Sequence, residues 1–407
     1  MKYSQQKTFL QGVMVLTVAH VMVKIIGATF KIPLTYIVGP EGYGIFITAY
    51  SIYSWAFVIA TAGLPVAISK LVSESVAVNN YKQAHKIFNI AFYLLSTIGI
   101  VGTIILFFGA GFLTNIIGNP SAYLSVIAIS PALLFVSLMS VYRGYFQGMQ
   151  NMMPTAISEV VEALGKLIIG YLLAYLWLIK GVEYASAGAT LGVSVGTLLG
   201  AVILYGVYRF SQKKLSKVKQ YSHNIKVKST RQIFVQLVKI SIPITLGASV
   251  LTLTNAIDLI TIMNRLVSIG FSYQEANELY GYLGYAVNLF NFPPTMVSAL
   301  AISVVPAVAR ALTVQNYRLA RKTTESTIRI ALLFALPAGM GLSLLSEPIL
   351  QLVYQSTKPT QLLALMGIAS IFVCLVLVTS AILQSTGKVM IPVRNMFIGG
   401  VVKIMTN

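Results

Sequence analysis

Charged side chains and cysteine are both scarce in this sequence. Of its 407 residues, 10% are charged and 57% are hydrophobic, and the one cysteine is Cys374. Because soluble domains carry about 25% charged residues, this composition excludes a soluble globular protein. A lone cysteine excludes an intrachain disulfide and argues against a metal cluster built on cysteine. The sequence therefore predicts a polytopic membrane protein.

Residues of the kinds that enzymes use are also few. The chain has one aspartate, Asp258, and three histidines, and no two acids in a loop have a spacing that suggests acid and base roles. The nucleotide-binding motif GxxxxGK followed by Ser or Thr is absent. We therefore expect neither catalysis nor a resident cofactor. Any transport would draw on an ion gradient, the membrane potential or the gradient of the substrate itself.

Apolar segments long enough to cross a membrane, about 20 residues each, recur along the chain. We predict an all-α protein of about eleven spans, the last of them cut short. The spans lie at 9–37, 45–69, 87–112, 121–145, 154–178, 184–208, 233–257, 281–306, 326–346, 360–384 and 391 onward. The segment 258–280 is predicted to be an outer loop with a short helix of its own.

Basic residues separate these spans in an alternating pattern. The net charge is +19, but the lysines and arginines lie between apolar spans, so we expect no binding of nucleic acid. Connections rich in lysine and arginine, including that of Arg143, follow every second span, which places the N-terminus in the cytoplasm. The longest connection, 209–231, has eight basic residues and no acid. It is predicted to be a cytoplasmic linker, with contact to anionic lipids or a partner as the alternative.

An internal repeat divides the chain. The segment 80–86 (NYKQAHK) recurs as 316–322 (NYRLARK), and Tyr43-Gly44 recurs as Tyr280-Gly281. We therefore predict two copies of a six-helix unit: an N-terminal lobe at 1–208, the linker at 209–231, and a C-terminal lobe at 232–407 that is incomplete at its end. Six spans are an even number, so the copies are expected to be parallel repeats around a central cavity.

The first predicted span has a polar, cationic face. Thr17, His20, Lys24, Lys31 and Thr35 fall on one stripe at 100° per residue. Charges inside a span are costly and by default functional, so we expect this face to line a water-filled interior and to bind an anion. The alternative is that Lys24 and Lys31 extend to a membrane interface.

Two further groups of ionisable residues lie inside predicted spans. Glu162 and Lys166 are four residues apart, which favours an ion pair, and Glu159 precedes them in an intramembrane charge network. Asp258, with Thr254 and Thr261 one turn to either side, has the hard oxygen ligands that a cation such as Na⁺ prefers. An ion pair between Asp258 and Arg265 is the alternative. Na⁺ and H⁺ are the candidate coupling ions.

Two motifs resemble a known family. Residues 62–74 (AGLPVAISKLVSE) and 142–158 (YRGYFQGMQNMMPTAIS) are similar to the stage V sporulation protein B type of polysaccharide transporter. This family belongs to the multidrug/oligosaccharidyl-lipid/polysaccharide (MOP) exporter superfamily, together with the lipid II flippases. The resemblance implies two six-helix lobes around a V-shaped cavity, alternating access, and export of an undecaprenyl-linked glycan, with lipid II as the leading cargo.

The resemblance also implies roles for individual residues. The cationic residues that the family has on helix 1 correspond to Lys24 and Lys31, and the sodium-binding aspartate of some members corresponds to Asp258. Asn288 stands where lipid II flippases have an arginine, and residues 50–62 have no counterpart to their arginine on helix 2. The expected partners are the lipid-linked oligosaccharide, membrane lipids and cell-wall synthesis enzymes, in the cytoplasmic membrane of a bacterium. The alternatives are a cation-coupled multidrug antiporter and a non-transporting scaffold for cell-wall synthesis.

Overall fold

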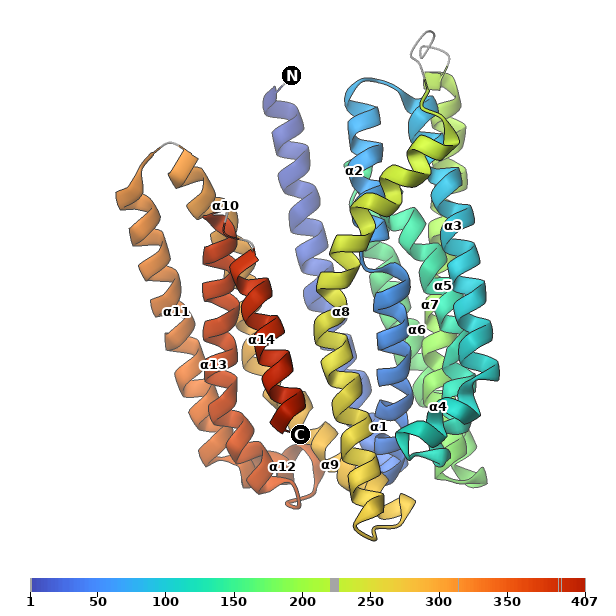
Figure 1. Ribbon diagram of the computed structural model, residues 1–407, viewed down its shortest axis with the longest axis vertical. Helices are drawn as coiled ribbons and strands as arrows, with labels where there is room; N and C mark the ends of the chain where they lie inside the picture. The colour runs from blue at the N-terminus through green and yellow to red at the C-terminus, as the bar shows by residue number, and fades with distance from the viewer. Residues whose placement is uncertain (1, 220–226, 314, 387, 389, 407) are drawn as a thin grey trace. The chain divides into compact units, whose positions relative to one another are not determined.

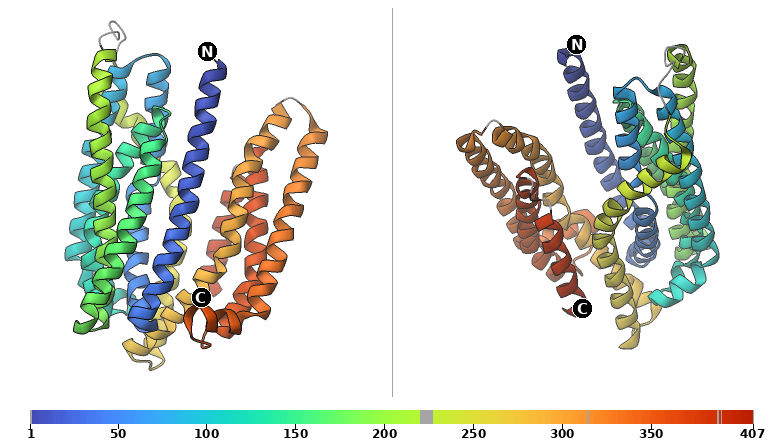
Figure 2. Two further views of the ribbon diagram at one scale, coloured as in Figure 1. Left: turned by 180° about the vertical axis from the view of Figure 1, so that it is seen from behind. Right: turned by 45° about the horizontal axis from the view of Figure 1, so that its top comes forward.

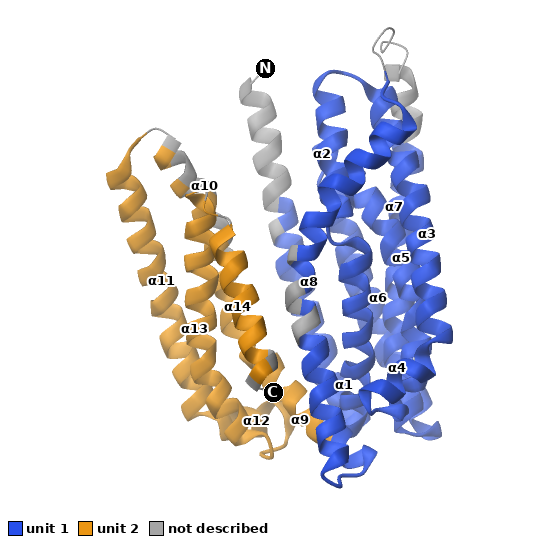
Figure 3. Cartoon of the chain, in the orientation of Figure 1, with its two compact units in different colours: residues 1–277 blue, residues 278–407 orange. Residues whose placement is uncertain are grey.

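A computed structural model describes residues 2–219, 227–313, 315–386, 388 and 390–406. All regular elements in this described part are α-helices or short 3₁₀ helices, which confirms the predicted all-α class. The chain divides into two compact units, residues 1–277 and 278–407 (Figure 3). This division falls one element later than the linker at 209–231, because helix α8 packs within the first unit.

Unit 1 is a bundle of long helices (Figure 1). Its elements are α1 (Lys2–Thr61), α2 (Leu64–Ala77), α3 (Tyr81–Phe108), α4 (Ala110–Ile117), η1 (Pro120–Ala122), α5 (Tyr123–Gly148), α6 (Met153–Trp177), η2 (Leu178–Lys180), α7 (Val182–Lys219), α8 (Thr230–Ser268) and the start of α9 (Tyr273–Phe290). Helices α5, α6 and α7 pack against one another, and α1 packs against all three. Residues 209–219 of the predicted linker continue α7, and Ser229 caps α8 by accepting a hydrogen bond from the backbone of Gln232.

Element α1 consists of two helices that are separated by a break at Gly39. Gly39 has φ 66° and ψ −177°, a conformation outside the helical region, and Pro40 follows it. Only glycine adopts such a backbone at little cost, so the chain turns here between the two spans predicted at 9–37 and 45–69. The second helix bends again at Gly63 and continues as α2. Figure 2 shows both helices from two further directions.

A ridge of glycines brings α6 and α7 unusually close. Gly188, Gly192, Gly196 and Gly200 recur every fourth residue and lie on one face of α7. A methyl group on Gly192 would overlap the backbone of Gly170 in α6, and one on Gly196 would overlap the backbone of Glu162 and Lys166. Small residues at this spacing allow membrane helices to approach closely and to gain packing energy that lipid does not supply.

Unit 2 contains the rest of α9 and, in the described residues, five helices after it: α10 (Phe292–Thr313), α11 (Tyr317–Leu344), the short α12 (Ser346–Tyr354), α13 (Thr360–Ser385) and α14 (Met390–Thr406). Its core lies where α10, α11 and α13 meet. Val297, Ala331, Ala335, Cys374 and Val378 are all buried there. Cys374 is therefore a core residue in a packed interior.

The helices of the two units match at the offset found in the sequence. Helix α3 begins at Tyr81 and α11 at Tyr317, and each has 28 residues. Asn80 and Asn316 cap these helices with nearly equal backbone angles, and each side chain accepts a hydrogen bond from a backbone N–H three residues later. The residues before them, Asn79 and Gln315, both have positive φ. The relation of the two copies by an axis along the membrane normal stays a prediction.

Some predicted boundaries are wrong. The segment 258–280 is not a long loop, because α8 continues to Ser268 and α9 begins at Tyr273. The span predicted at 281–306 consists of two helices, α9 and α10, separated at Asn291 before the Pro293-Pro294 pair. By length and composition alone, seven described helices are suited to cross a membrane. The stretch Val18–Ala77 counts as one of these, although two spans were predicted there, at 9–37 and 45–69.

The glycine ridge can be tested by adding one methyl group. Gly192→Ala should lower the free energy of unfolding by about 1–3 kcal/mol, since the new Cβ has to displace the α6 backbone. Gly206→Ala is a matched control on the same helix, because the space around Gly206 is open, and it should leave stability equal or raise it by up to about 1 kcal/mol. Thermal unfolding of the purified protein in detergent measures both. Equal stability of the two variants would contradict the close packing of α6 on α7.

Candidate functional site

The first half of α1 presents polar side chains with different surroundings. His20 and Lys24 are exposed at the surface of unit 1, Lys31 is half-buried, and Thr35 is buried with its hydroxyl donating to the carbonyl of Ile32. The side chain of Thr17 lies outside the described residues. The polar stripe predicted on this helix is therefore exposed at His20 and Lys24 and becomes buried toward Thr35.

His20 contacts a carboxylate of another helix. Its Nε2 lies 3.1 Å from Oε2 of Glu159 on α6, with His20 54% exposed and Glu159 18% exposed. The two atoms are near each other without the alignment of a hydrogen bond, and Oε2 is hidden from solvent. The structure thus brings together two residues that the sequence placed in separate groups, the cationic face and the charge network.

Glu162 lies between two cations in the interior of unit 1. Its Oε1 accepts a hydrogen bond from Nζ of Lys166 at 2.6 Å, the pair that their spacing predicts. Its Oε2 accepts one from Arg143 on α5 at 2.9 Å. The exposed fractions are 13% for Glu162, 17% for Arg143 and 23% for Lys166. A carboxylate so far removed from water needs such partners, because an unpaired buried charge is strongly destabilising.

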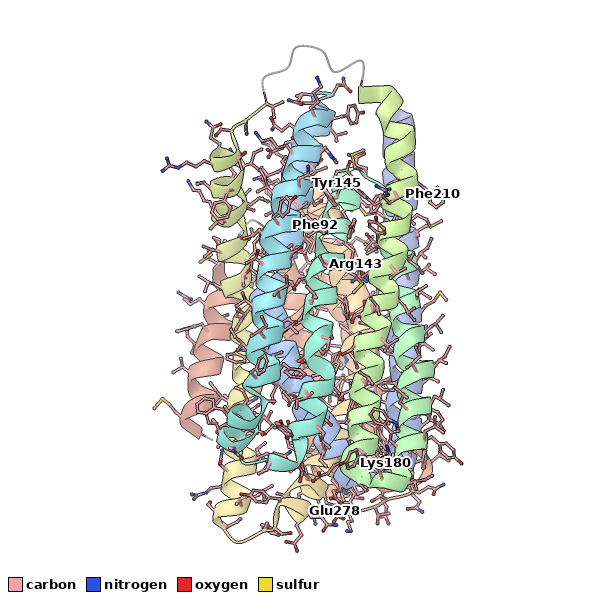
Figure 4. The ribbon with its side chains drawn as sticks, turned by 90° about the vertical axis from the view of Figure 1, so that its right-hand side faces the viewer. Phe92, Arg143, Tyr145, Lys180, Phe210 and Glu278 are labelled. Carbon is pink, nitrogen blue, oxygen red and sulfur yellow. The ribbon has the colours of Figure 1, made fainter. Side chains whose placement is uncertain are left out.

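The alternation of charges along the sequence assigned Arg143 to a loop, and this assignment is wrong. It lies inside α5, where Nε donates to the hydroxyl of Ser158 at 3.0 Å in addition to the contact with Glu162. In Figure 4 it lies within the length of the bundle, between Phe210 and Lys180. The position of this arginine before the end of an apolar run was the sequence signal that it lies inside a helix. Its partner Glu162 is 19 residues away and is brought to it by tertiary packing alone.

The glycine ridge leaves space for this network. A methyl group on Gly196 would meet the side chain of Lys166, and one on Gly200 would meet Met139 and Cβ of Glu162. Because α7 has no side chain at these positions, α6 can approach it while Glu162 faces α5. The network of Arg143, Glu162 and Lys166 therefore connects α5 to α6 and carries one excess positive charge.

The candidate cation site on α8 is only partly described. Asp258 and Thr261 are half-buried and three residues apart, so they lie on one side of the helix. The side chain of Thr254 lies outside the described residues. Coordination of a cation by these groups stays a prediction.

Asn288 lies in unit 2 as part of a set of contacts made by α9. Its side-chain amide donates to the hydroxyl of Tyr354 at 3.4 Å, and the ring of Tyr354 stacks on Tyr285 with centroids 4.3 Å apart. Nearer the start of the helix, Glu278 accepts hydrogen bonds from Lys358 at 2.7 Å and from the hydroxyl of Tyr282 at 2.9 Å. We call these contacts the unit 2 clasp, since they fasten α9 to α12 and the turn after it. The predicted role of Asn288 in substrate binding is untested by this geometry.

The charge network should be far more sensitive to substitution than an exposed pair of the same spacing. Glu162→Gln leaves Arg143 and Lys166 without their shared anion and should lower the free energy of unfolding by about 3–5 kcal/mol. Glu325→Gln is the matched control, because Glu325 forms an i,i+4 pair with Arg321 in which both side chains are largely exposed. It should have a negligible effect. Thermal unfolding in detergent would contradict the network if both variants lost stability equally.

The unit 2 clasp predicts a dependence of stability on pH. The hydrogen bond from Lys358 lowers the pKa of Glu278, with a second contribution from Tyr282. A depressed pKa in the folded state means that the contribution is complete above the unfolded pKa and is lost as the pH falls through the folded pKa. Lys358→Met should therefore lower the unfolding temperature at neutral pH, and the difference from wild type should shrink in acid. Lys180→Met, at an exposed position in unit 1, should show no such change with pH.

The comparisons with known proteins agree with this architecture. The family model described as "Polysaccharide biosynthesis protein" matches residues 9–313, and a model described as "MatE" matches residues 259–407. Stage V sporulation protein B of Bacillus subtilis (strain 168) is 27% identical over 400 residues, which cover 98% of this chain and 77% of that protein. Lipid II flippase MurJ of the same organism is 28% identical over 417 residues, covering 98% and 76%.

Solved structures share the fold at low sequence identity. A multidrug resistance MATE family transporter of the MOP superfamily in an inward-facing conformation has a TM-score of 0.72 at 14% identity, covering 96% of this chain and 88% of that one. Lipid II flippase MurJ in an inward closed conformation has a TM-score of 0.68 at 16% identity, covering 96% and 80%. The chain is therefore a multi-pass membrane protein of the polysaccharide biosynthesis protein family, with the fold of the MOP superfamily transporters.

Proposed function

We propose that this protein is a flippase that exports an undecaprenyl-pyrophosphate-linked glycan precursor across the cytoplasmic membrane by alternating access, with lipid II as the leading cargo. The family and the similarity to a protein named as a lipid II flippase support transport of a lipid-linked glycan. The single observation that carries the choice of an anionic cargo is the basic first half of α1, where His20 and Lys24 are exposed and Lys31 follows on the same stripe.

The geometry of this stripe suits a pyrophosphate head group. Seven residues turn a helix through 700°, so Lys24 and Lys31 project within about 20° of each other and are separated by roughly 10 Å along the axis. Ammonium groups bind phosphate oxygens by charge-assisted hydrogen bonds. The two lysines could therefore hold the pyrophosphate and the first sugar beyond it.

The state of the acids in unit 1 disfavours the multidrug antiporter. A carrier of organic cations needs carboxylates that are available to its substrate. Glu162 is compensated by two cations, and Glu159 lies against His20. The described α1 to α6 region thus offers an excess of positive groups, which favours an anion over a cation.

The third candidate function is a scaffold that recruits cell-wall synthesis enzymes without transporting. Charge reversal on α1 distinguishes it from a flippase. A scaffold would tolerate charge reversal on α1, because its partners would contact the loops. A flippase would not. The proposal includes coupling of transport to an ion, either Na⁺ bound at Asp258 or H⁺.

Charge reversal at the two lysines tests the proposed function. Lys24→Ala should weaken recognition of the cargo, and Lys24→Glu combined with Lys31→Glu should abolish transport, because like charges repel the head group. Lys24→Arg should be tolerated, since the positive charge is retained. The measurement is complementation of a flippase-depleted bacterial strain with membrane levels matched between variants. Lys180→Glu, at an exposed position outside the polar stripe of α1, is the control and should complement. Normal growth with the double reversal would refute the proposal.

A further inference from the structure

The first turns of α8 lie across α2 and α3. Helix α8 contacts both of them, and Figure 1 shows its first turns inclined across the two helices. Ile233 and Leu237, four residues apart and therefore on one side of α8, are buried. Pro243 has no N–H to donate within the helix, which favours a bend at this point. The start of α8 is thus packed into unit 1 separately from the rest of the helix.

This packing brings together two lysines from distant segments. Nζ of Lys86, on α3, donates to the backbone carbonyl of Lys228 at 2.9 Å. The backbone N–H of Lys228 donates to Oε1 of Gln83 at 3.3 Å, and its Nζ donates to Oε1 of Gln236 at 3.2 Å. Every acceptor in this set is neutral. The contacts therefore place two lysines next to each other while their charges stay uncompensated by these partners.

Three more basic side chains extend this positive region. Lys82 on α3 and Arg231 and Lys239 on α8 are all exposed. We call the whole set the α3–α8 basic surface: Lys82, Lys86, Lys228, Arg231 and Lys239. Within the part of the chain that the structure describes, none of the five forms an ion pair, and neither does Glu74 on the adjoining α2. A group of like charges without acids among them attracts an anion.

An apolar strip borders the basic surface on the same helix. Phe234, Val235 and Ile242 are 43%, 52% and 50% exposed. Val235 and Ile242 are seven residues apart, so they project within about 20° of each other. The span predicted in the sequence begins at residue 233, so the strip and the cations meet where the hydrocarbon layer is expected to begin. Basic residues beside exposed apolar ones are typical of helices at a membrane interface.

The two parts together determine which ligand fits. Ammonium groups form charge-assisted hydrogen bonds with phosphate oxygens, and the apolar strip can cover hydrocarbon chains. A free phosphate would use the cations alone and leave the strip uncovered. A phospholipid with a net negative head group uses both parts at once, and it lies in the membrane beside them.

We propose that the α3–α8 basic surface binds the head group of an anionic phospholipid, with Lys86 and Lys228 on its phosphate and its acyl chains along Phe234, Val235 and Ile242. The bound lipid would join α3 to the start of α8 across unit 1. This lipid is a neighbour of the protein in the membrane and not its cargo, so the proposal is independent of the proposed function.

Binding of phosphatidylglycerol to the purified protein in detergent, measured by native mass spectrometry, tests the proposal. Lys86→Gln combined with Lys228→Gln should weaken binding by about tenfold, because both phosphate contacts are lost. Arg318→Gln combined with Lys322→Gln is the matched control, since it removes the same charge at the equivalent place of the repeat. There Leu319, in the position of Gln83, is 50% exposed, and this variant should bind like wild type. Equal binding by both double variants would refute the proposal.

Two further ligands identify the source of the phosphate. Phosphatidylcholine has the same chains without a net charge and should bind more weakly than phosphatidylglycerol. Glycerol 3-phosphate has the phosphate without the chains and should not displace the lipid. Displacement by glycerol 3-phosphate at the concentration at which the lipid itself competes would overturn the proposal in favour of a free phosphate. Equal binding of the two lipids would overturn the role of charge.

A conservative pair of substitutions separates binding from folding. Lys86→Arg combined with Lys228→Arg retains both charges and should retain binding. Higher salt should weaken the binding of wild type, because screening acts on exposed charges. Thermal unfolding without added lipid should be the same for the arginine and the glutamine variants. Loss of binding in the arginine variant as large as in the glutamine variant would contradict recognition through charge.

Discussion

The ion network around Glu162 depends on helices that approach each other more closely than ordinary side chains permit. A carboxylate in the interior of a membrane bundle is tolerated when its oxygens are paired, and Arg143 and Lys166 provide one partner for each oxygen. The glycine ridge of α7 gives α6 the position from which Glu162 reaches α5. On the same helix, one turn earlier, Glu159 faces His20 of α1. Packing of backbone on backbone therefore determines where the charges of unit 1 lie.

The acidic side chains of α6 are less exposed to solvent than the basic side chains at the start of α1. Glu162 is paired with Arg143 and Lys166, and Glu159 lies against His20, whereas the side chains of His20 and Lys24 are exposed on α1. Buried acids beside exposed basic side chains favour an anionic ligand. Under the proposed function, these exposed basic groups of unit 1 supply the physical reason why an anionic, lipid-linked cargo would be recognised.

The two occurrences of a repeated dipeptide lie in different surroundings. The Tyr-Gly dipeptide occurs at Tyr43-Gly44 and again at Tyr280-Gly281. In the first copy, Gly44 receives the backbone of Asn277. In the second, the neighbouring residues Glu278 and Tyr282 form the clasp with Lys358. Similar sequences thus support a polar, glycine-dependent contact in one unit and an ionic, aromatic contact in the other.

The sequence by itself determined the all-α membrane class and the recurrence of segment 80–86 at 316–322, because these properties follow from composition and from patterns along the chain. Local chemistry also predicted the pairing of Glu162 with Lys166, since four residues bring two side chains together on any helix. The tertiary structure determined which residues of distant segments contact one another. Arg143 was assigned to a loop, and Glu159 was grouped with Glu162 and Lys166 and not with His20. The two hydrogen bonds that join the side-chain amides of Asn119 and Asn277 were not predicted. Each of these contacts joins helices far apart in the sequence, and which helix faces which is a property of packing that no local pattern encodes.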